Sequence, residues 1–370
     1  MSVVAFKYRL YPTNTQEQML EETLEVCRLV YNSLLGWRKH DYENHGVAPD
    51  YSVQALALTR WKPHHPELCQ IHSQVLQNVA KRVAATYEDF FRRVRTGEKF
   101  GFPRFKGSRQ YNSFTYPQSG FRVGQQSVHL FMFGTRSQIK ARIHRPVEGE
   151  IKTCTVHRAN HKWYVCLHAE VNPKPLLPLA TAVGIDVGLE TFAALSDGEL
   201  IPNPRFFRKD EKALAKAARR LSRHICNTRA RRKARKVVSR IHERIRSRRH
   251  DFVHQTARKL VRRFGLISVE ELNVTGMVKN HCLAKSIADA SWSMFRAVLT
   301  QKAESAGRQL IVVSPRYTSQ TCSGCGSVKP KTLSQRQHRC EACGLSLNRD
   351  VNAARNILTV GLHGVAGSPA

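Results

Sequence analysis

The first third of the chain switches between a two-residue and a helical pattern of apolar positions. Every second residue is apolar over 3–10, which predicts a half-buried strand. Thr15 followed by Gln18 resembles the capping box that opens a helix. Apolar residues at helical spacing then predict helices over about 15–37 and 71–94.

The middle of the chain returns to a period of two between residues 113 and 171. Several short strands joined by turn residues favour a small β-barrel. The strand over 3–10 is expected to return to this barrel, which makes the helices between them an insertion. Pro173, Pro175 and Pro178 then predict a linker.

The last half of the chain has the pattern of a mixed α/β sheet. Residues 182–187 and 192–196 are predicted to form a hairpin, and the helix over 292–307 is flanked by apolar strands over 266–269 and 310–313. Residues from 359 onward resemble a loose tail.

The net charge of the chain is unusual for a globular protein. Among 370 residues, 60 Lys and Arg oppose 28 Asp and Glu, a formal net charge of +32. Such a charge opposes compaction unless a polyanion neutralises it, and nucleic acid is the polyanion that releases counterions on binding. A membrane surface is the weaker alternative. No apolar run long enough to span a bilayer and no signal-peptide pattern occur, so we expect no membrane and a cytoplasmic, nucleoid-associated location.

The basic residues are concentrated between residues 205 and 249, where acids are few. A solvated helix face usually mixes charge signs, so this segment favours a helix that follows phosphates over an ordinary surface. A second basic segment, 91–106, contains aromatic residues that either stack on bases or pack beneath a turn. The arginines of the first segment include Arg219, Arg220, Arg223, Arg231, Arg232, Arg235, Arg246, Arg248 and Arg249.

Four of the ten cysteines form two Cys-x-x-Cys pairs: Cys322 with Cys325, and Cys340 with Cys343. Two such knuckles give the four soft ligands of a closed tetrahedral site, which predicts one structural Zn²⁺ rather than four unrelated thiols. Because four cysteines already fill the coordination shell, we predict that the nearby His338 is not a zinc ligand. The other six cysteines are expected to be buried small residues rather than a disulfide framework.

Three acids lie at positions from which they can meet at one edge of the predicted sheet. Asp186 lies within an apolar strand, Glu270 closes another, and Asp350 follows Asn348 in the first turn of a helix. Each has an ordinary explanation: an exposed strand face, a solvated strand end, or the preference of helix starts for acids. Together they predict a two-metal nuclease site. Alternation allows only one of Glu270 and its neighbour Glu271 to face it.

Several motifs together resemble the TnpB (OrfB) family encoded by insertion sequences. The resemblance runs from end to end and rests on the segments 8–12, 27–32, 101–106, 184–188, 269–274, the cysteine pairs and 348–354. It implies an RNA-guided DNA endonuclease related to type V CRISPR effectors, with Asp186, Glu270 and Asp350 as catalytic acids. None of these acids departs from the family pattern.

The resemblance also implies a multidomain α/β fold. Its expected parts are a wedge β-barrel (1–12 and 108–178), a helical recognition lobe (13–107), an RNase H-like RuvC nuclease domain (179–316 and 346–360), an inserted zinc ribbon (317–345) and a flexible tail (361–370). The N-terminal half would grip the guide RNA and read a short motif beside the target. The motif-reading candidates are Tyr51, Gln74 and Gln77, with Arg104 and Lys106 as further nucleic-acid contacts.

The chemistry expected of this arrangement is hydrolysis of double-stranded DNA with two Mg²⁺ ions about 3.5–4 Å apart, since hard carboxylate oxygens suit Mg²⁺. One protein monomer per guide RNA is favoured. An RNA-guided repressor that binds without cutting and a DNA transposase are the alternative functions. A miniature CRISPR effector would carry out similar chemistry.

Overall fold

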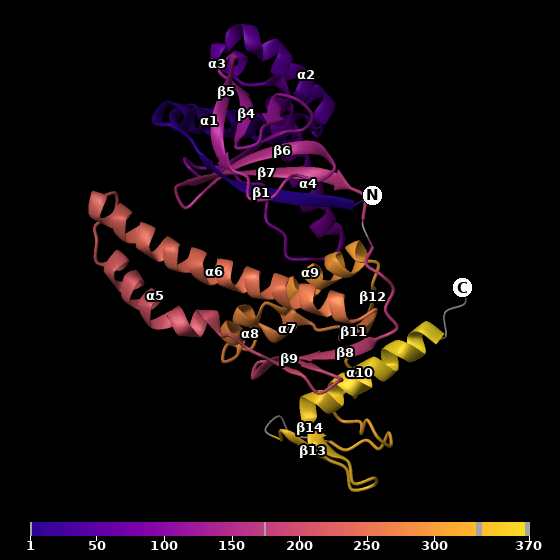
Figure 1. Cartoon of the computed structure of the whole chain (residues 1–370). Coiled ribbons are helices and arrows are strands. Elements are labelled where there is room, and N and C mark those ends of the chain that lie inside the picture. The colour runs from indigo at the N-terminus through magenta and orange to yellow at the C-terminus, as the bar shows by residue number, and fades with distance from the viewer. Residues whose placement is uncertain (1, 174, 331–334, 367–370) are drawn as a thin grey trace. The chain divides into compact units, whose positions relative to one another are not determined.

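The computed structural model describes residues 2–173, 175–330 and 335–366 (Figure 1). The chain forms two compact units, residues 1–172 and 173–370, and the boundary falls at the start of the predicted proline linker. Each unit has its own hydrophobic core. None of the helices in the described ranges combines the length and apolar composition needed to cross a bilayer.

The first unit is built on a seven-stranded antiparallel sheet in the order β2-β6-β7-β1-β5-β4-β3. The first strand buries Phe6, Tyr8 and Leu10 and pairs with β5 and β7, so its predicted return to the later strands is confirmed. Among the described residues β2 and β3 are the two edges and do not pair, so the small β-barrel predicted from the sequence is an open half-barrel. The strands are β1 (Ser2–Tyr11), β2 (Ser113–Tyr116), β3 (Phe121–Val123), β4 (Ser127–Met132), β5 (Thr135–Arg142), β6 (Glu150–Ala159) and β7 (Lys162–Val171).

The helices of this unit all lie between β1 and β2 in the sequence. The capping box was misplaced by the sequence pattern, because the N-cap of the first helix is Thr13 and its partner is Gln16, not Thr15 and Gln18. Thr13 directly follows Pro12 and is still extended, so the helix begins one residue later. The helices are α1 (Asn14–His45), α2 (Tyr51–Trp61), the 3₁₀ turn η1 (Lys62–His64), α3 (Pro66–Cys69) and α4 (Ser73–Arg95).

The second unit is a three-layer α/β structure. Its five-stranded sheet has the order β10-β9-β8-β11-β12, with β8 parallel to β11 and antiparallel to β9, which confirms the predicted hairpin and mixed sheet. Val183 and Ile185 of β8 pack against α6 and α9, whereas α10 covers the opposite face (Figure 1). The strands are β8 (Ala182–Val187), β9 (Thr191–Leu195), β10 (Leu200–Pro202), β11 (Leu266–Glu270) and β12 (Gln309–Val313), and a separate pair is β13 (Gln337–Arg339) with β14 (Ser346–Asn348).

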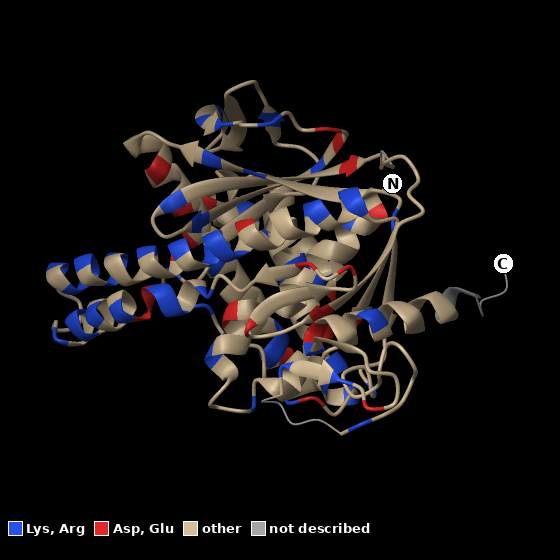
Figure 2. Cartoon of the chain, turned by 60° about the horizontal axis from the view of Figure 1, so that its bottom comes forward, with Lys and Arg blue, Asp and Glu red and all other residues tan. Residues whose placement is uncertain are grey.

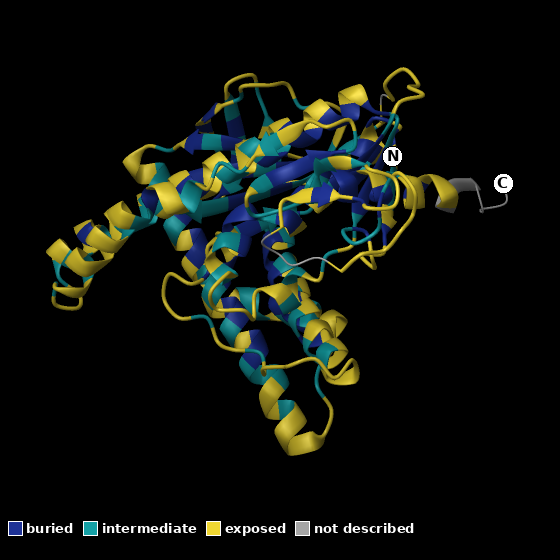
Figure 3. Ribbon diagram, turned by 90° about the horizontal axis from the view of Figure 1, so that it is seen from below, coloured by how far each residue is buried: buried dark blue, intermediate teal, exposed yellow. Residues whose placement is uncertain are grey.

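The basic segment of the second unit folds into a helical hairpin, α5 (Phe206–Ser222) and α6 (Arg229–Arg263). The second half of α6 is amphipathic, and its apolar side packs on the sheet through Val253, Ala257 and Leu260, whereas the turn between the helices is largely exposed (Figure 3). The remaining helices are α7 (Val274–Met277), α8 (Ala284–Ala290), α9 (Trp292–Ser305) and α10 (Arg349–Ala366).

Two further expectations about the chain are wrong. The predicted tail is helical as far as Ala366, because Gly361 lets α10 lie against Ser268 of β11; residues 367–370 lie outside the described residues. The six scattered cysteines are not all buried, because some lie on core-facing positions of helices and strands and others lie on surface segments. Cys27 and Cys154 are buried and Cys166 is half-buried, but the exposed ones are Cys69, Cys226 and Cys282.

Candidate active site and nucleic-acid interface

Asp186 lies on β8 two residues after Gly184, on the sheet face that α10 covers. A Cβ atom at position 184 would lie 2.0 Å from the carbonyl oxygen of Ala354 and 2.6 Å from the backbone nitrogen of Leu358, both in α10. Only glycine therefore allows the helix to lie directly on this strand. Side chains two residues apart on a strand share a face, so Asp186 lies on the face that meets α10.

Glu270 ends the neighbouring parallel strand, at the same edge of the sheet. Ser268 of β11 pairs with Gly184 of β8, which places Glu270 beside Asp186 two residues further along. Ser268 contacts Gly361 of α10. Because Glu270 is two residues from Ser268, it also lies on the α10 face.

Of the two adjacent acids, only the first turns into the site. The hydroxyl group of Thr318 donates a hydrogen bond of 2.7 Å to Oε1 of Glu270. The side chain of Glu271 is 69% exposed and lies 4.0 Å from Arg296. Because successive side chains of a strand point to opposite faces, Glu270 faces the cleft and Glu271 faces solvent.

Asp350 completes the group from the first turn of α10. The side-chain oxygen of Asn348 accepts hydrogen bonds from the backbone N–H groups of Asp350 (2.8 Å) and Val351 (3.3 Å), which confirms that Asn348 opens this helix. The cap fixes where the helix begins. Since α10 lies on β8 through Gly184, this start is held beside Asp186.

Asp186 is acted on electrostatically by the other two carboxylates. Burial raises the pKa of Asp186 well above its ordinary value, and the nearby Glu270 and Asp350 raise it further, while Arg349 opposes the shift. Burial also raises the pKa of Glu270, against the lowering effect of the Thr318 hydrogen bond. Acids gathered in this way are costly without a cation, so the donor set fits a bound divalent metal ion.

A cleft of about 850 Å³ contains all three acids. Its other lining residues include Arg205 and Arg208 at the start of α5 and Arg349 beside Asp350, which could contact phosphate groups. The cleft lies wholly within the second unit. It therefore combines hard oxygen donors with nearby positive charge.

The four predicted zinc ligands form a tight cluster. The Sγ atoms of Cys322 and Cys343 are 3.6 Å apart, and those of Cys325 and Cys340 are 3.5 Å apart. A tetrahedral Zn²⁺ with bonds of about 2.3 Å places its sulfur atoms about 3.8 Å apart, so these positions fit the ion. Hydrogen bonding to Ser327 lowers the pKa of Cys340, which favours its thiolate, whereas the pKa of Cys343 in the same cluster is raised, against the lowering effect of a backbone hydrogen bond from Leu345.

The carboxylate trio is more widely spaced than the cysteine cluster. In the part of the chain that the structure describes, the cysteines are the one group of at least three His, Cys, Asp or Glu side chains whose donor atoms all lie within 4.8 Å of one another.

His338 is buried close to this cluster on β13. The four thiols already supply a complete ligand set.

Two buried asparagines of α10, which were not among the predicted site residues, connect the acidic cleft to the four-cysteine cluster. The side-chain amide of Asn356 donates to the carbonyl groups of Thr318 (2.8 Å) and Thr321 (2.7 Å). Asn352 also donates to Thr321 (2.7 Å) and accepts from the backbone N–H of Ser323 (2.9 Å), inside the first cysteine knuckle. Their four-residue spacing on one helix face was the only available sequence signal.

Lys and Arg are frequent along both helices of the basic hairpin (Figure 2), and most of its predicted arginines are exposed. Arg231 is different, because its guanidinium group donates to the carbonyl groups of Leu221 (3.1 Å) and His224 (2.8 Å) at the end of α5. This arginine therefore joins the two helices. The exposed members are Arg219, Arg220, Arg223, Arg232, Arg235, Arg246 and Arg248, whereas Arg249 is half-buried.

The base of the hairpin is anchored beside the cleft by Asp289, another residue that the sequence analysis missed. Its carboxylate accepts hydrogen bonds from the backbone N–H of Phe207 (2.9 and 3.0 Å) and from Arg249 (2.8 Å). A carboxylate at the start of α5 also complements the helix dipole. Because Asp289 lines the cleft, it links the position of the hairpin to the candidate active site.

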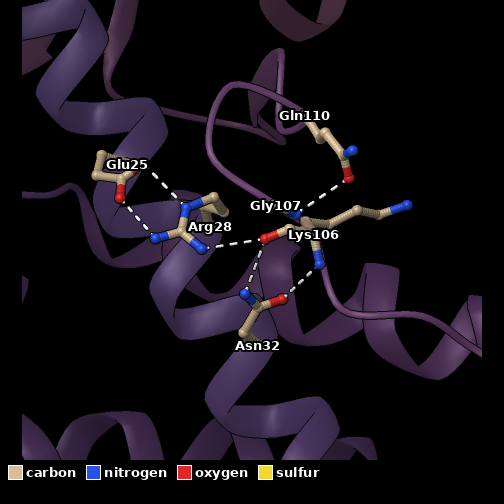
Figure 4. A network of polar contacts seen from close by, with 6 residues as sticks. All are labelled: Glu25, Arg28, Asn32, Lys106, Gly107 and Gln110. Carbon is tan, nitrogen blue, oxygen red and sulfur yellow. Dashed lines mark hydrogen bonds and ion pairs between the residues drawn. The ribbon is translucent and has the colours of Figure 1, made fainter.

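In the first unit, the backbone of Lys106 is fixed by a network of polar contacts (Figure 4). Its carbonyl group accepts from Arg28 (3.0 Å) and Asn32 (2.9 Å), and its N–H donates to Asn32 (2.8 Å). Arg28 is held in turn by Glu25. The ammonium group points away from this network and lies 5.7 Å from the ring of Tyr31.

The other candidates in the first unit have different surroundings. Gln74 accepts hydrogen bonds from the backbone N–H groups of residues 118 and 119, so it holds the turn between β2 and β3. Tyr51 opens α2 with 39% of its surface exposed, and Gln77 and Arg104 are exposed. Geometry therefore gives Gln74 a structural role and leaves the other three accessible.

Three family models match successive parts of the chain. The model of OrfB of IS605, described as "Probable transposase", matches residues 164–281. The model "Cas12f1-like, TNB domain" matches residues 292–357, which include the four cysteines. A "Helix-turn-helix domain" model matches residues 1–46, where this structure has β1 and α1.

Known relatives match over nearly the whole chain. A Streptomyces pristinaespiralis protein named "Putative RNA-guided DNA endonuclease" is 37% identical over 97% of this chain and 89% of the relative. "Putative RNA-guided DNA endonuclease InsQ" of Escherichia coli K12 is 33% identical over 96% of this chain and 92% of the relative.

A solved structure has the same overall fold. The Cas12f1 chain from a cryo-EM complex with sgRNA and target DNA matches with a TM-score of 0.60 at 16% identity, covering 93% of this chain and 83% of that chain. At this identity the likeness concerns the fold alone.

Proposed function

Because this chain belongs to the TnpB (OrfB) family of IS605-type insertion sequences, we propose that it is an RNA-guided, Mg²⁺-dependent DNA endonuclease of the RuvC type. Its substrate is double-stranded DNA next to a short target-adjacent motif. The observation that carries this proposal is the convergence of Asp186, Glu270 and Asp350 in one cleft.

In the proposed mechanism the three acids form the metal-binding set. Asp186, whose pKa both Glu270 and Asp350 raise, would hold the ions together with these two acids. Bound Mg²⁺ ions would supply an activated water nucleophile and stabilisation of the leaving 3′ oxygen. Arg205 and Arg208 line the same cleft and can hold the phosphate backbone there.

Sequence choice in this proposal comes from base pairing between guide RNA and target strand. The protein then holds the heteroduplex by its backbone. The exposed arginines of the α5–α6 hairpin and the exposed residues of the first unit are the proposed contacts. The first unit would serve as wedge and recognition lobe, and residues 317–345 as a zinc ribbon inserted in the nuclease domain. One protein per guide RNA is the proposed stoichiometry.

The test is a cutting assay with the purified protein, its guide RNA and matched double-stranded DNA. Cutting is expected only with Mg²⁺. Asp186→Ala should abolish it while guided DNA binding persists, and the exposed neighbour in Glu271→Ala is the matched control that should still cut.

Three results would contradict the proposal. Binding without cutting by the unaltered protein would indicate an RNA-guided repressor. Joined DNA ends would indicate a transposase. Equal loss of cutting and binding in Asp186→Ala would mean that Asp186 does not act only in catalysis.

A further inference from the structure

The hydroxyl group of Thr318 donates a hydrogen bond to the carboxylate of Glu270. Thr318 is 5% exposed and lies in the segment between β12 and the first cysteine knuckle. Its hydroxyl has a single proton and two acceptors in reach: Glu270 at 2.7 Å and the carbonyl of Pro315 at 3.3 Å. The shorter, charge-assisted bond is the stronger one.

A bond of this kind restricts the orientation of the carboxylate. Without it, Glu270 at the open end of β11 could rotate about its side-chain torsions. A partner that fixes the orientation of a metal-binding carboxylate contributes to metal affinity and activity. Thr318 therefore has the geometry of a residue that prepares Glu270 for a cation.

The position of Thr318 depends on α10. The Asn356 amide holds the carbonyl of Thr318 directly and also holds Thr321, while Asn352 holds Thr321 and the backbone of Ser323. A continuous set of hydrogen bonds thus runs from the cysteine knuckle through the two asparagines to Glu270. Both asparagines are at most 9% exposed, so water does not readily replace these bonds.

We propose that Thr318 is a positioning residue for Glu270, and that Asn352 and Asn356 make its position depend on the folded zinc site. This inference rests on the proposed function, since it takes Glu270 as a metal ligand. It assigns the cysteine cluster a second consequence besides stability. An intact zinc site keeps one carboxylate of the cleft in the orientation that binds a divalent ion.

The central experiment compares Thr318→Val with Thr318→Ser in the full chain bound to its guide RNA. Valine has nearly the shape of threonine but cannot donate, whereas serine keeps the hydroxyl. Thr359→Val is the matched control, because the Thr359 hydroxyl is exposed and bonds only to the carbonyl of Arg355 within α10.

Three quantities are measured for each variant: the cutting rate as a function of Mg²⁺ concentration, the affinity for Mn²⁺ alone by electron paramagnetic resonance, and zinc content. Thr318→Val is expected to weaken Mn²⁺ binding and cutting by about 10–100-fold, the usual effect of losing a partner of a metal ligand. The Mg²⁺ concentration needed for half-maximal cutting should rise as the affinity for Mn²⁺ falls. Zinc content should stay at one ion per chain, and Thr318→Ser and Thr359→Val should resemble the unaltered protein.

The dependence on α10 is tested with Asn356→Ala. If Asn356 acts through Thr318, the double variant Thr318→Val with Asn356→Ala loses no more Mn²⁺ affinity than Thr318→Val alone, because coupled residues are not additive. Fully additive losses would refute the connection through Asn356.

The experiments can refute the positioning role of Thr318 without refuting the proposed nuclease function. If Asp186→Ala abolishes cutting but Thr318→Val keeps the Mn²⁺ affinity and Mg²⁺ requirement of the unaltered protein, only the positioning role is refuted. Failure of serine to restore what valine loses would refute it too, since the hydroxyl would then not be the active feature. If Asp186→Ala cuts normally, the proposed function itself fails.

Discussion

Replacing Gly184 with alanine tests how the fold brings the acids together. The new methyl group would lie 2.0 Å from the carbonyl oxygen of Ala354, and the obstacle is backbone rather than a side chain that could rotate away. Restoring an ordinary contact requires a relative shift of α10 and β8 of about 1.4 Å, and misplacement by about 1 Å can reduce a rate about 100-fold. Overpacking of this kind also costs about 1–3 kcal/mol of stability.

Gly184→Ala is therefore expected to slow cutting by about 100-fold in a protein that still binds guide RNA. The assay is single-turnover cutting with saturating Mg²⁺, combined with urea unfolding of the same sample. Gly36→Ala in α1 is the control, because its new Cβ would meet only the ring of Phe105 at 3.6 Å, which is an ordinary contact. A cutting rate equal to that of the unaltered protein, or a loss explained entirely by the unfolded fraction, would refute the reasoning.

Three further predictions follow from the charges and the zinc site. Arg231→Ala should lower the free energy of unfolding by about 1–3 kcal/mol, because two carbonyl groups lose a charged donor. The exposed Arg232→Ala should instead weaken RNA binding and reduce its salt dependence, with stability unchanged; equal stability losses in urea would contradict this assignment. The raised pKa of Asp186 means that the folded state holds the proton more tightly, so without metal the unfolding free energy should fall as pH rises from the ordinary toward the raised pKa. Asp186→Asn should flatten this slope in urea titrations, and an unchanged slope would count against it. Cys325→Ser should lose zinc and lower the melting temperature of the second unit, and retained zinc would contradict its role as a ligand.

Patterns between near neighbours in the chain were sufficient for much of the fold. The two-residue period predicted β1, short apolar segments predicted the β8–β9 hairpin, and the cysteine spacing predicted a cluster whose geometry fits zinc. Such patterns failed where a longer-range contact decided the outcome. The last helix turns beyond residue 360 looked like a tail because the sequence does not show that Gly361 meets Ser268.

The sequence by itself determined which residues could do chemistry: three acids in apolar strands or at a helix start, and four paired thiols. Tertiary structure decided that the acids share a cleft, that Arg231 joins two helices, and that Thr318, Asn352 and Asn356 connect the zinc site to Glu270. The physical reason is range, because strand and helix periods relate residues a few positions apart. Thr318 and Glu270 are 48 residues apart in the chain and meet only because β11 and α10 pack together.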